Sequence, residues 1–235
     1  MYNMSNQHLP YKPGTTGGEI SRPDPRDDKW SLIGAAIAPF DWNKGYDIQQ
    51  VLGIPIKTKD QGVSLSCGGQ MTSYYGEVLE ALLTGSHEPR SAKFTYSQVY
   101  VPPMGGSFMR DNFDVVINQG LAEERLCLSY ENGAIPSEAF MRRSQDITPE
   151  ARENAKLFKG KRYAQVNSFS IDAVAQAIEV NFGAGLLIEG TNNGTWLSEF
   201  PVMPPVVGEW RHFVYAGRAK LINGKKHVGF INSWG

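Results

Sequence analysis

The 235-residue chain lacks several features that would point to particular classes of protein. It has only two cysteines, Cys67 and Cys127, which cannot form a disulfide framework and which fit a reducing compartment better. No run approaches the roughly 18 consecutive apolar residues that span a bilayer. Charge of one sign is not in excess, because 23 basic residues balance 24 acidic ones. The chain therefore carries no electrostatic signal for nucleic acid or an anionic membrane.

A convincing secretion signal is also missing. The apolar stretch at residues 30–38 begins late, follows acidic rather than basic residues and ends at Pro39, unlike a signal peptide. We therefore expect this stretch to pack onto the domain as a strap, and we expect a cytoplasmic location. With 41% hydrophobic residues, the chain has enough apolar material to form a sizeable core.

The first 37 residues differ in composition from the rest. They are polar and rich in turn formers, as in Gly17-Gly18 and the run at 22–28. Such a composition cannot bury enough apolar surface to form a core of its own. We predict an N-terminal arm or linker over residues 1–37, with a short pro-segment as an alternative interpretation of it. Residues 38–235 are predicted to form one domain.

The rest of the chain divides into a helical part, at about 60–130, and a β-rich part, at about 160–235. Helical apolar spacing ends at a stop glycine in three segments: after Ser66 to Gly85, Ser107 to Gly120 and Ser170 to Gly183. Ser107 and Ser170 can cap the second and third of these helices. A fourth candidate from Thr148 is mostly charged and predicts a surface insertion. Strands are predicted at 184–190, 212–221 and 226–233, the last two joined by an Asn223-Gly224 hairpin turn. The fold class is α+β with two lobes.

Cys67 is placed where a thiol becomes reactive. It opens the first predicted helix, whose N-terminal partial positive charge favours a thiolate. The ordinary alternative is a buried structural cysteine, which is how we interpret Cys127 in its apolar context. The histidines and cysteines lack the spacing of metal ligands, so no metal site and no cofactor are expected.

A thiolate nucleophile needs a general base that is held in place by a third group. Three of the four histidines lie in polar surroundings and are expected at the surface: His8, His87 and His227. His212 opens an apolar strand, where it is either a satisfied core histidine or the base. Asn232 and Trp234 follow in the string Asn-Ser-Trp-Gly and offer an amide and a shielding indole.

Together these residues resemble the papain-like cysteine peptidases. The family's order is an oxyanion-hole glutamine, a cysteine that opens a long helix, a histidine, and an asparagine within Asn-Ser-Trp-Gly. Here Gln61 precedes Cys67 by the family's own interval, and His212 and Asn232 follow in order. The resemblance covers about residues 38–235 and implies the papain-like two-lobe fold.

The resemblance also implies a role for each residue of the site. Cys67 would attack a peptide carbonyl as a thiolate paired with protonated His212. Gln61 and the Cys67 N–H would hold the oxyanion, and Asn232 would orient the imidazole beneath Trp234.

The substrate side of the site is implied in the same way. Gly105 and Gly106 resemble the glycine pair that bonds extended substrate, and Trp234 would border the site. The expected partner is a peptide or protein substrate, with no nucleic acid and no membrane.

Three departures from the family leave alternatives open. Ser64 replaces a disulfide cysteine, Gly68 replaces a tryptophan, and the sequence stops at Gly235 where relatives continue. A shortened form, or a partner chain that completes the C-terminal β edge, is expected from the last of these. A papain-fold binding module without activity is the main alternative. A cell-wall amidase or transglutaminase-like enzyme is disfavoured, because those families do not pair an upstream Gln with Asn-Ser-Trp-Gly.

The hairpin register sets a condition on the proposed triad. A two-residue turn would pair Ile222 with Lys225 and place Tyr215 opposite Asn232. His212 and Asn232 would then point to opposite faces of the sheet. We therefore predict a one-residue bulge, at either Gly217 or Gly229, that brings both side chains to one face.

Overall fold

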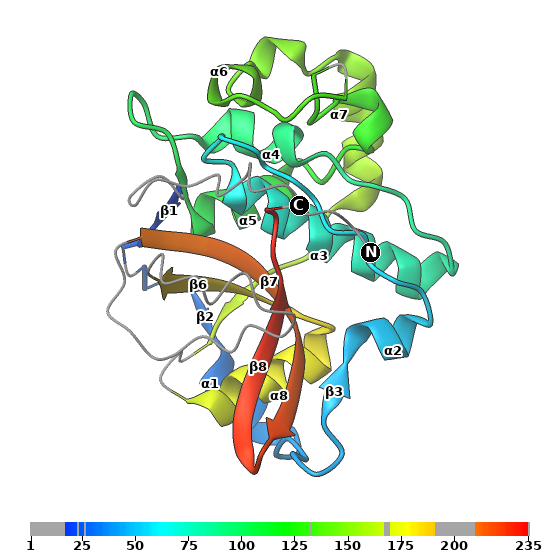
Figure 1. The fold of residues 1–235 in the computed structure, drawn as a ribbon, viewed down its shortest axis with the longest axis vertical. Coiled ribbons are helices and arrows are strands. Elements are labelled where there is room, and N and C mark those ends of the chain that lie inside the picture. The colour runs from blue at the N-terminus through cyan, green and yellow to red at the C-terminus, as the bar shows by residue number, and fades with distance from the viewer. Residues whose placement is uncertain are drawn as a thin grey trace, which may run out of the picture.

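The computed structural model describes residues 17–22, 24–25, 27–131, 133–166, 170–190 and 210–234. Most helices gather in one half of the molecule, and the main sheet lies in the other half with α8 against it (Figure 1). The helices are α1 (Trp30–Ile33), α2 (Ile48–Leu52), α3 (Cys67–Thr84), α4 (Ala92–Val99), α5 (Met109–Asn118), α6 (Glu138–Met141), α7 (Pro149–Ala155) and α8 (Ile171–Asn181). The strands are β1 (Gly18–Glu19), β2 (Asp28–Lys29), β3 (Tyr46–Asp47), β4 (Ser107–Phe108), β5 (Ala164–Gln165), β6 (Ala184–Gly190), β7 (Trp210–Ile222) and β8 (Lys225–Ile231).

The long helix α3 forms the centre of the molecule, as its apolar spacing predicts. Met71, Tyr74 and Val78 are buried along one face, where they pack against Phe213 of β7. The helix ends at Gly85, whose φ of 73° lies in the left-handed region that glycine adopts without strain. α3 therefore joins the helical half to the sheet.

Two other helical predictions need correction at their ends. α8 begins as predicted, with the Ser170 side chain accepting from the Ala173 N–H, but Phe182 rather than Gly183 ends the helix, with a φ of 62° and an exposed side chain. α5 begins at Met109, and Ser107 is not its cap because it belongs to strand β4.

The charged segment after Thr148 is not a surface insertion, so that prediction is wrong. Thr148 caps α7, and Ala151 and Ala155 are fully buried against Phe94 and Val115. Ala151 and Ala155 lie four residues apart on one face of the helix, and their small side chains allow the helix to approach the core closely. α4, which the sequence did not reveal, is buried along most of its length.

The main sheet has the order β3-β7-β6, and β8 pairs with β7. The hairpin turn pairs Ile222 with Lys225, and the register then shifts between Ala216 and Arg218, which makes Gly217 the extra residue. The predicted bulge is confirmed. Beyond it Tyr215 pairs with Ile231, so the sheet positions that follow change face.

The N-terminal segment packs on the domain. Trp30 is buried and its indole N–H donates to Gln176 Oε1 of α8, at 3.1 Å. The Gln176 amide in turn donates to carbonyls of the strap, including that of Ala38 at 2.9 Å. The expected strap is confirmed. None of the helices in the described part of the chain has the length and apolar character of a membrane span.

Candidate active site

Cys67 is the first residue of α3 and is completely buried. The first N–H groups of a helix have no partner within it, so they surround the thiol with partial positive charge. Burial nevertheless raises the pKa of Cys67 to about 12, and backbone hydrogen bonds at Phe213 and Gly68 oppose that rise only in part. Burial in this form of the molecule therefore favours the protonated thiol over the thiolate.

His212 and Asn232 meet on one face of the sheet. His212 Nε2 lies 2.8 Å from Asn232 Oδ1, and the same oxygen accepts the Ser233 N–H at 2.8 Å. The ring of Trp234 lies over the imidazole, with 4.7 Å between the ring centroids. Because an amide oxygen only accepts, this contact places a hydrogen on Nε2 and fixes the tautomer of His212.

Gln61 is buried beside the start of α3. Its Nε2 donates to the Ser64 carbonyl at 2.9 Å, and its Oε1 accepts from Ser233 Oγ at 2.6 Å. The Gln61 N–H also donates to the Ser233 carbonyl at 2.8 Å. These contacts orient the amide and leave its second Nε2 hydrogen to another acceptor.

Tyr74 is a member of this site that the sequence did not reveal. Its hydroxyl accepts from the Lys59 N–H at 2.5 Å and donates to the Asn232 carbonyl at 2.9 Å. The hydroxyl thus connects the Gln61 segment to the Asn232 segment through the central helix. Sequence spacing assigned Tyr74 only to the buried face of α3, and no local signal identifies the partners of its hydroxyl.

The two glycines predicted to bind substrate both have left-handed backbone conformations. Gly105 has a φ of 91° and Gly106 a φ of 76°. A Cβ on Gly105 would overlap Arg142 and Glu138, whereas a Cβ on Gly106 would lie 2.6 Å from the Gly17 carbonyl oxygen. Gly106 therefore lies against the backbone of another segment of the chain, and Gly105 lies against the side chains of Arg142 and Glu138.

The segment that lies against Gly106 is the protein's own N-terminal segment. The Gly17 carbonyl accepts the Ser107 N–H at 2.9 Å, and β1 continues parallel to β4. A Cβ on Gly17 would overlap the Leu65 carbonyl, and one on Gly18 would lie 3.3 Å from His212 N. Residues 17 and 18 thus run between the turn before Cys67 and strand β7, and a side chain is excluded at Gly17 by the Leu65 backbone.

Arg110 of α5 fastens the next part of this segment. Its guanidinium forms two hydrogen bonds with the Asp27 carboxylate, one of them at 3.1 Å, and donates to the Arg22 carbonyl at 2.8 Å. The Arg110 N–H lies 3.3 Å from Ser21 Oγ. One side chain and its backbone therefore hold three positions of the segment.

The family departures have structural counterparts. Both cysteines are free thiols, and Ser64 Oγ donates to the Gln61 carbonyl and lies 2.7 Å from Ser66 Oγ. A Cβ on Gly68 would lie 2.5 Å from Asn112 Nδ2. Asn112 of α5 therefore fills the space next to Gly68, and a larger residue there would require this side chain to move.

The other candidate residues lie away from this site. His87 is not simply solvated as expected, because its Nε2 lies 3.0 Å from the buried Glu77 carboxylate. His227 Nδ1 lies 2.8 Å from the Lys225 carbonyl at an exposed position, and His8 falls outside the described residues. Among the residues that the structure describes, no group of three or more metal-ligating side chains occurs.

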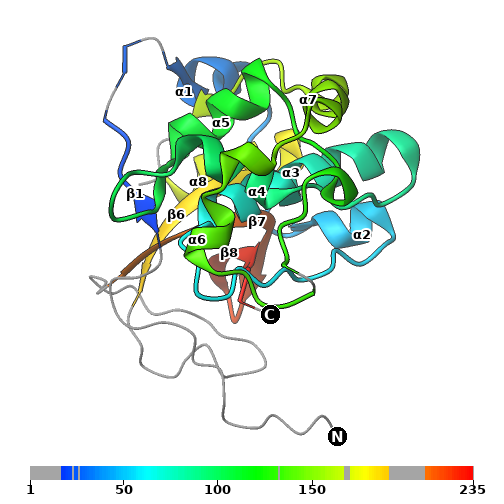
Figure 2. The same cartoon turned by 90° about the horizontal axis from the view of Figure 1, so that it is seen from above.

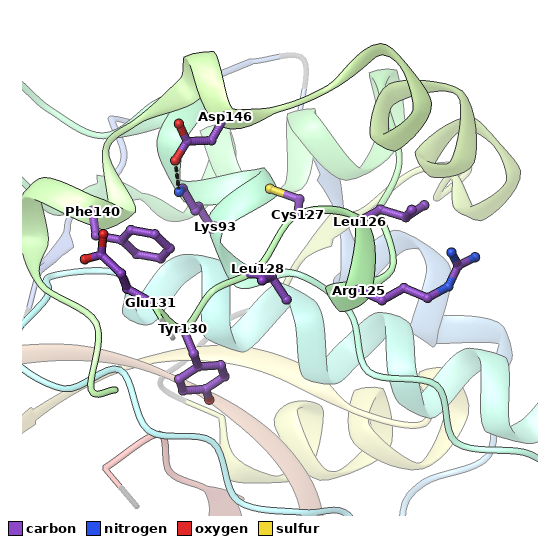
Figure 3. A pocket seen from close by; sticks show the side chains of 9 residues that line it. All are labelled: Lys93, Arg125, Leu126, Cys127, Leu128, Tyr130, Glu131, Phe140 and Asp146. Carbon is purple, nitrogen blue, oxygen red and sulfur yellow. Dashed lines mark hydrogen bonds and ion pairs between the residues drawn. The ribbon is translucent and has the colours of Figure 1, made fainter. Parts of the chain in front are cut away.

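A pocket of about 400 Å³ lies in the helical half, beside Cys127 (Figure 3). The Lys93 ammonium lines it, forms an ion pair with Asp146 and lies 3.5 Å from the centre of the Phe140 ring. Cys127 itself is almost fully buried. None of the predicted site residues lines this pocket, so it is separate from Cys67 and His212.

Comparison with solved structures shows that the chain has the fold of papain-like cysteine proteases. No protein-family model and no curated protein matches the chain by sequence. The structure is similar to xylellain, a cysteine protease from Xylella fastidiosa, with a TM-score of 0.69 and 19% identity over 95% of this chain and 86% of that one. It is similar to procathepsin B from Trypanosoma congolense, with a TM-score of 0.65 and 13% identity over 94% and 76%. A recombinant stem bromelain precursor matches with a TM-score of 0.62 and 18% identity over 95% and 67%.

Proposed function

We propose that this chain, which has the papain-like α+β fold, is a cysteine-type peptidase that hydrolyses peptide bonds through an acyl-enzyme. The observation that carries the proposal is the 2.8 Å contact of His212 with Asn232 beneath Trp234. The contact depends on the Gly217 bulge, which leaves one residue of β7 unpaired with β8 and brings both side chains to the same face of the sheet. A hairpin with only a structural role would not require His212 and Asn232 to meet.

The proposed reaction uses only groups of this chain. Asn232 accepts the hydrogen on Nε2, so Nδ1 of His212 is the nitrogen that exchanges a proton with the Cys67 thiol. The thiolate adds to the carbonyl carbon, and the oxyanion is held by the free Gln61 Nε2 hydrogen and the Cys67 N–H. The imidazolium then protonates the leaving amine as the C–N bond breaks, and the imidazole activates water to hydrolyse the thioester.

The N-terminal segment would block this site in the form described. Gly17 takes the Ser107 N–H that an extended substrate backbone would need, and burial holds the Cys67 pKa near 12. We propose that residues 17–29 act as a short pro-segment, and that the site becomes reactive when they leave it. Entry of water would remove the cause of the raised pKa.

The test is labelling with an epoxide thiol inhibitor near pH 6, read by intact mass. We expect one adduct on the wild type, faster labelling of Arg110→Ala, none on Cys67→Ala and much slower labelling of His212→Ala. Cys127→Ala is the matched control and should behave like the wild type. A folded, reduced wild type and Arg110→Ala that both stay unlabelled would refute the peptidase. That result would favour a binding module, the alternative that the covered site and Gly68 support.

A further inference from the structure

We infer that Glu138 and Tyr96 are positioning residues that hold the two turns of the proposed active site together. One turn carries Leu65, just before Cys67, and the other carries Gly105 and Gly106. The inference rests on the proposed function, because it assigns these side chains to the binding of substrate backbone.

The Glu138 carboxylate is the hub of the contacts. Its Oε2 accepts the Leu65 N–H at 2.7 Å, and its Oε1 accepts the Tyr96 hydroxyl at 2.5 Å. Glu138 lies on the short helix α6 and Tyr96 on α4, so two separate elements converge on the turn. Hydrogen bonds to an ionised acceptor are the stronger kind and fix the geometry of the donor.

Tyr96 carries the connection to the second turn. Its side chain is completely buried, and its hydroxyl accepts the Gly106 N–H at 2.9 Å. Leu65 N–H, the Glu138 carboxylate, the Tyr96 hydroxyl and Gly106 N–H thus form one continuous chain. The hydroxyl donates to Glu138 and accepts from Gly106, so both of its functions are used.

A second route passes through Arg142. Its Nε donates to Glu138 Oε1 at 2.6 Å and its Nη1 donates to the Pro103 carbonyl at 3.0 Å. The Glu138 and Arg142 side chains occupy the space that a Cβ on Gly105 would need. The two glycines therefore have different steric roles. The absence of a side chain at Gly105 leaves room for Glu138 and Arg142, and its absence at Gly106 leaves room for the chain that pairs with Ser107.

A role through charge and a role through positioning predict opposite effects of Glu138→Gln on the reactions of Cys67. The carboxylate is a negative charge near Cys67, and after burial it adds a smaller contribution that raises the pKa of that thiol. If Glu138 acted only through charge, Glu138→Gln would speed every reaction of Cys67. If it acts through position, Glu138→Gln slows reagents that need the substrate-backbone site and spares small ones.

The experiment uses Tyr96→Phe and Glu138→Gln in the full chain, with Tyr100→Phe as the matched control. Tyr100 lies four residues along from Tyr96, under the Arg142 guanidinium. Two rates are measured at Cys67 by peptide mapping, for a peptidyl epoxide and for iodoacetamide. Hydrogen–deuterium exchange of residues 62–66 and 103–107 is followed in the same proteins.

We expect Tyr96→Phe and Glu138→Gln to lower the ratio of the epoxide rate to the iodoacetamide rate about tenfold, as for loss of one hydrogen bond to an ionised group. Exchange of both turns should become several-fold faster, while Tyr100→Phe changes neither. An unchanged ratio, or equal slowing of both reagents, would overturn the positioning role. A wild type that neither reagent labels would refute the peptidase and this role with it, while exchange alone would still report the link between the turns.

Discussion

At the scale of single residues, two glycines with the same φ angle allow backbone strain to be distinguished from a role in binding substrate. Gly106 and Gly133 both have a φ of 76°, but a Cβ on Gly133 meets nothing within 4 Å. Alanine at either position costs about 1–2 kcal/mol of strain. We expect Gly106→Ala to lose more stability in urea than Gly133→Ala, and to raise KM for peptide substrate. Equal KM values for the two variants would contradict a role of Gly106 in binding substrate backbone.

The proposed oxyanion role of Gln61 gives a second prediction at the scale of single residues. Gln61→Ala should lower kcat about 10²–10³-fold, the usual effect of losing one oxyanion donor. Ser233→Ala should cost less, about tenfold, because Ser64 still holds the Gln61 amide. Ser73→Ala is the matched control, since that hydroxyl bonds a carbonyl within α3. A kcat for Ser233→Ala equal to that of Ser73→Ala would show that Ser233 does not orient Gln61.

At the scale of elements, the second half of α3 carries a buried carboxylate that ties it to its surroundings. One oxygen of Glu77 lies 2.6 Å from Lys59 Nζ and the other lies 3.0 Å from His87 Nε2. Burial alone would raise the pKa of Glu77, but Lys59 and His87 outweigh it and lower that pKa. The hydrogen bond to Glu77 in turn raises the pKa of His87.

This pair predicts a pH dependence of stability. The pKa of His87 lies above its ordinary value of 6.5 in the folded state, so protonated His87 stabilises the fold below that value. The contribution is lost as the pH rises through the folded pKa. Urea unfolding at a series of pH values should show this loss for the wild type and not for His87→Gln. His227→Gln should follow the wild type, and a His87→Gln curve that does the same would rule the pair out as the cause.

The helices and strands differ in how far the sequence predicts them. A bulge was predictable, because the hairpin turn fixes the register and the proposed triad requires one face for both side chains, but its place at Gly217 rather than Gly229 was not. α4 was not, since burial on all sides removes the contrast between an apolar and a polar face. The hydroxyl partners of Tyr74 and Tyr96 depend on segments distant in sequence, and no local pattern encodes them.

At the scale of the whole molecule, the N-terminal segment crosses from one half to the other. Figure 2 shows the blue segment between β1 and α1 running along one side of the molecule. Composition predicted a segment without its own core. That agrees with β1 and β2, which are two residues long and pair with β4 and β5 of the domain. Its place beside Cys67 depends on contacts that exist only after folding, so composition could not predict it.

A truncation of the N-terminal segment would affect stability as well as access to Cys67. Removing residues 1–37 would also delete Trp30, which is buried on α8 and donates to Gln176 Oε1. It would remove the Ile37 carbonyl that Gln176 Nε2 bonds as well, although the Ala38 carbonyl would remain. A buried polar group without a partner costs about 1–3 kcal/mol, so such a truncation would mix instability with activation. A substitution at the contact that fastens the segment separates the two effects.

Arg110→Ala is that substitution. It removes the hydrogen bonds to Asp27 and Arg22 while Trp30 stays on α8. Charge-assisted bonds of this partly exposed kind contribute about 1–2 kcal/mol, so residues 17–19 should leave the site about tenfold more often. We expect a tenfold faster reaction of Cys67 with the epoxide at neutral pH and a melting temperature close to that of the wild type. Arg152→Ala removes an exposed guanidinium with only long contacts and should change nothing. If Arg110→Ala reacts no faster than Arg152→Ala, the segment does not limit access to Cys67, and the raised pKa of that thiol must come from the packing of α3 against β7.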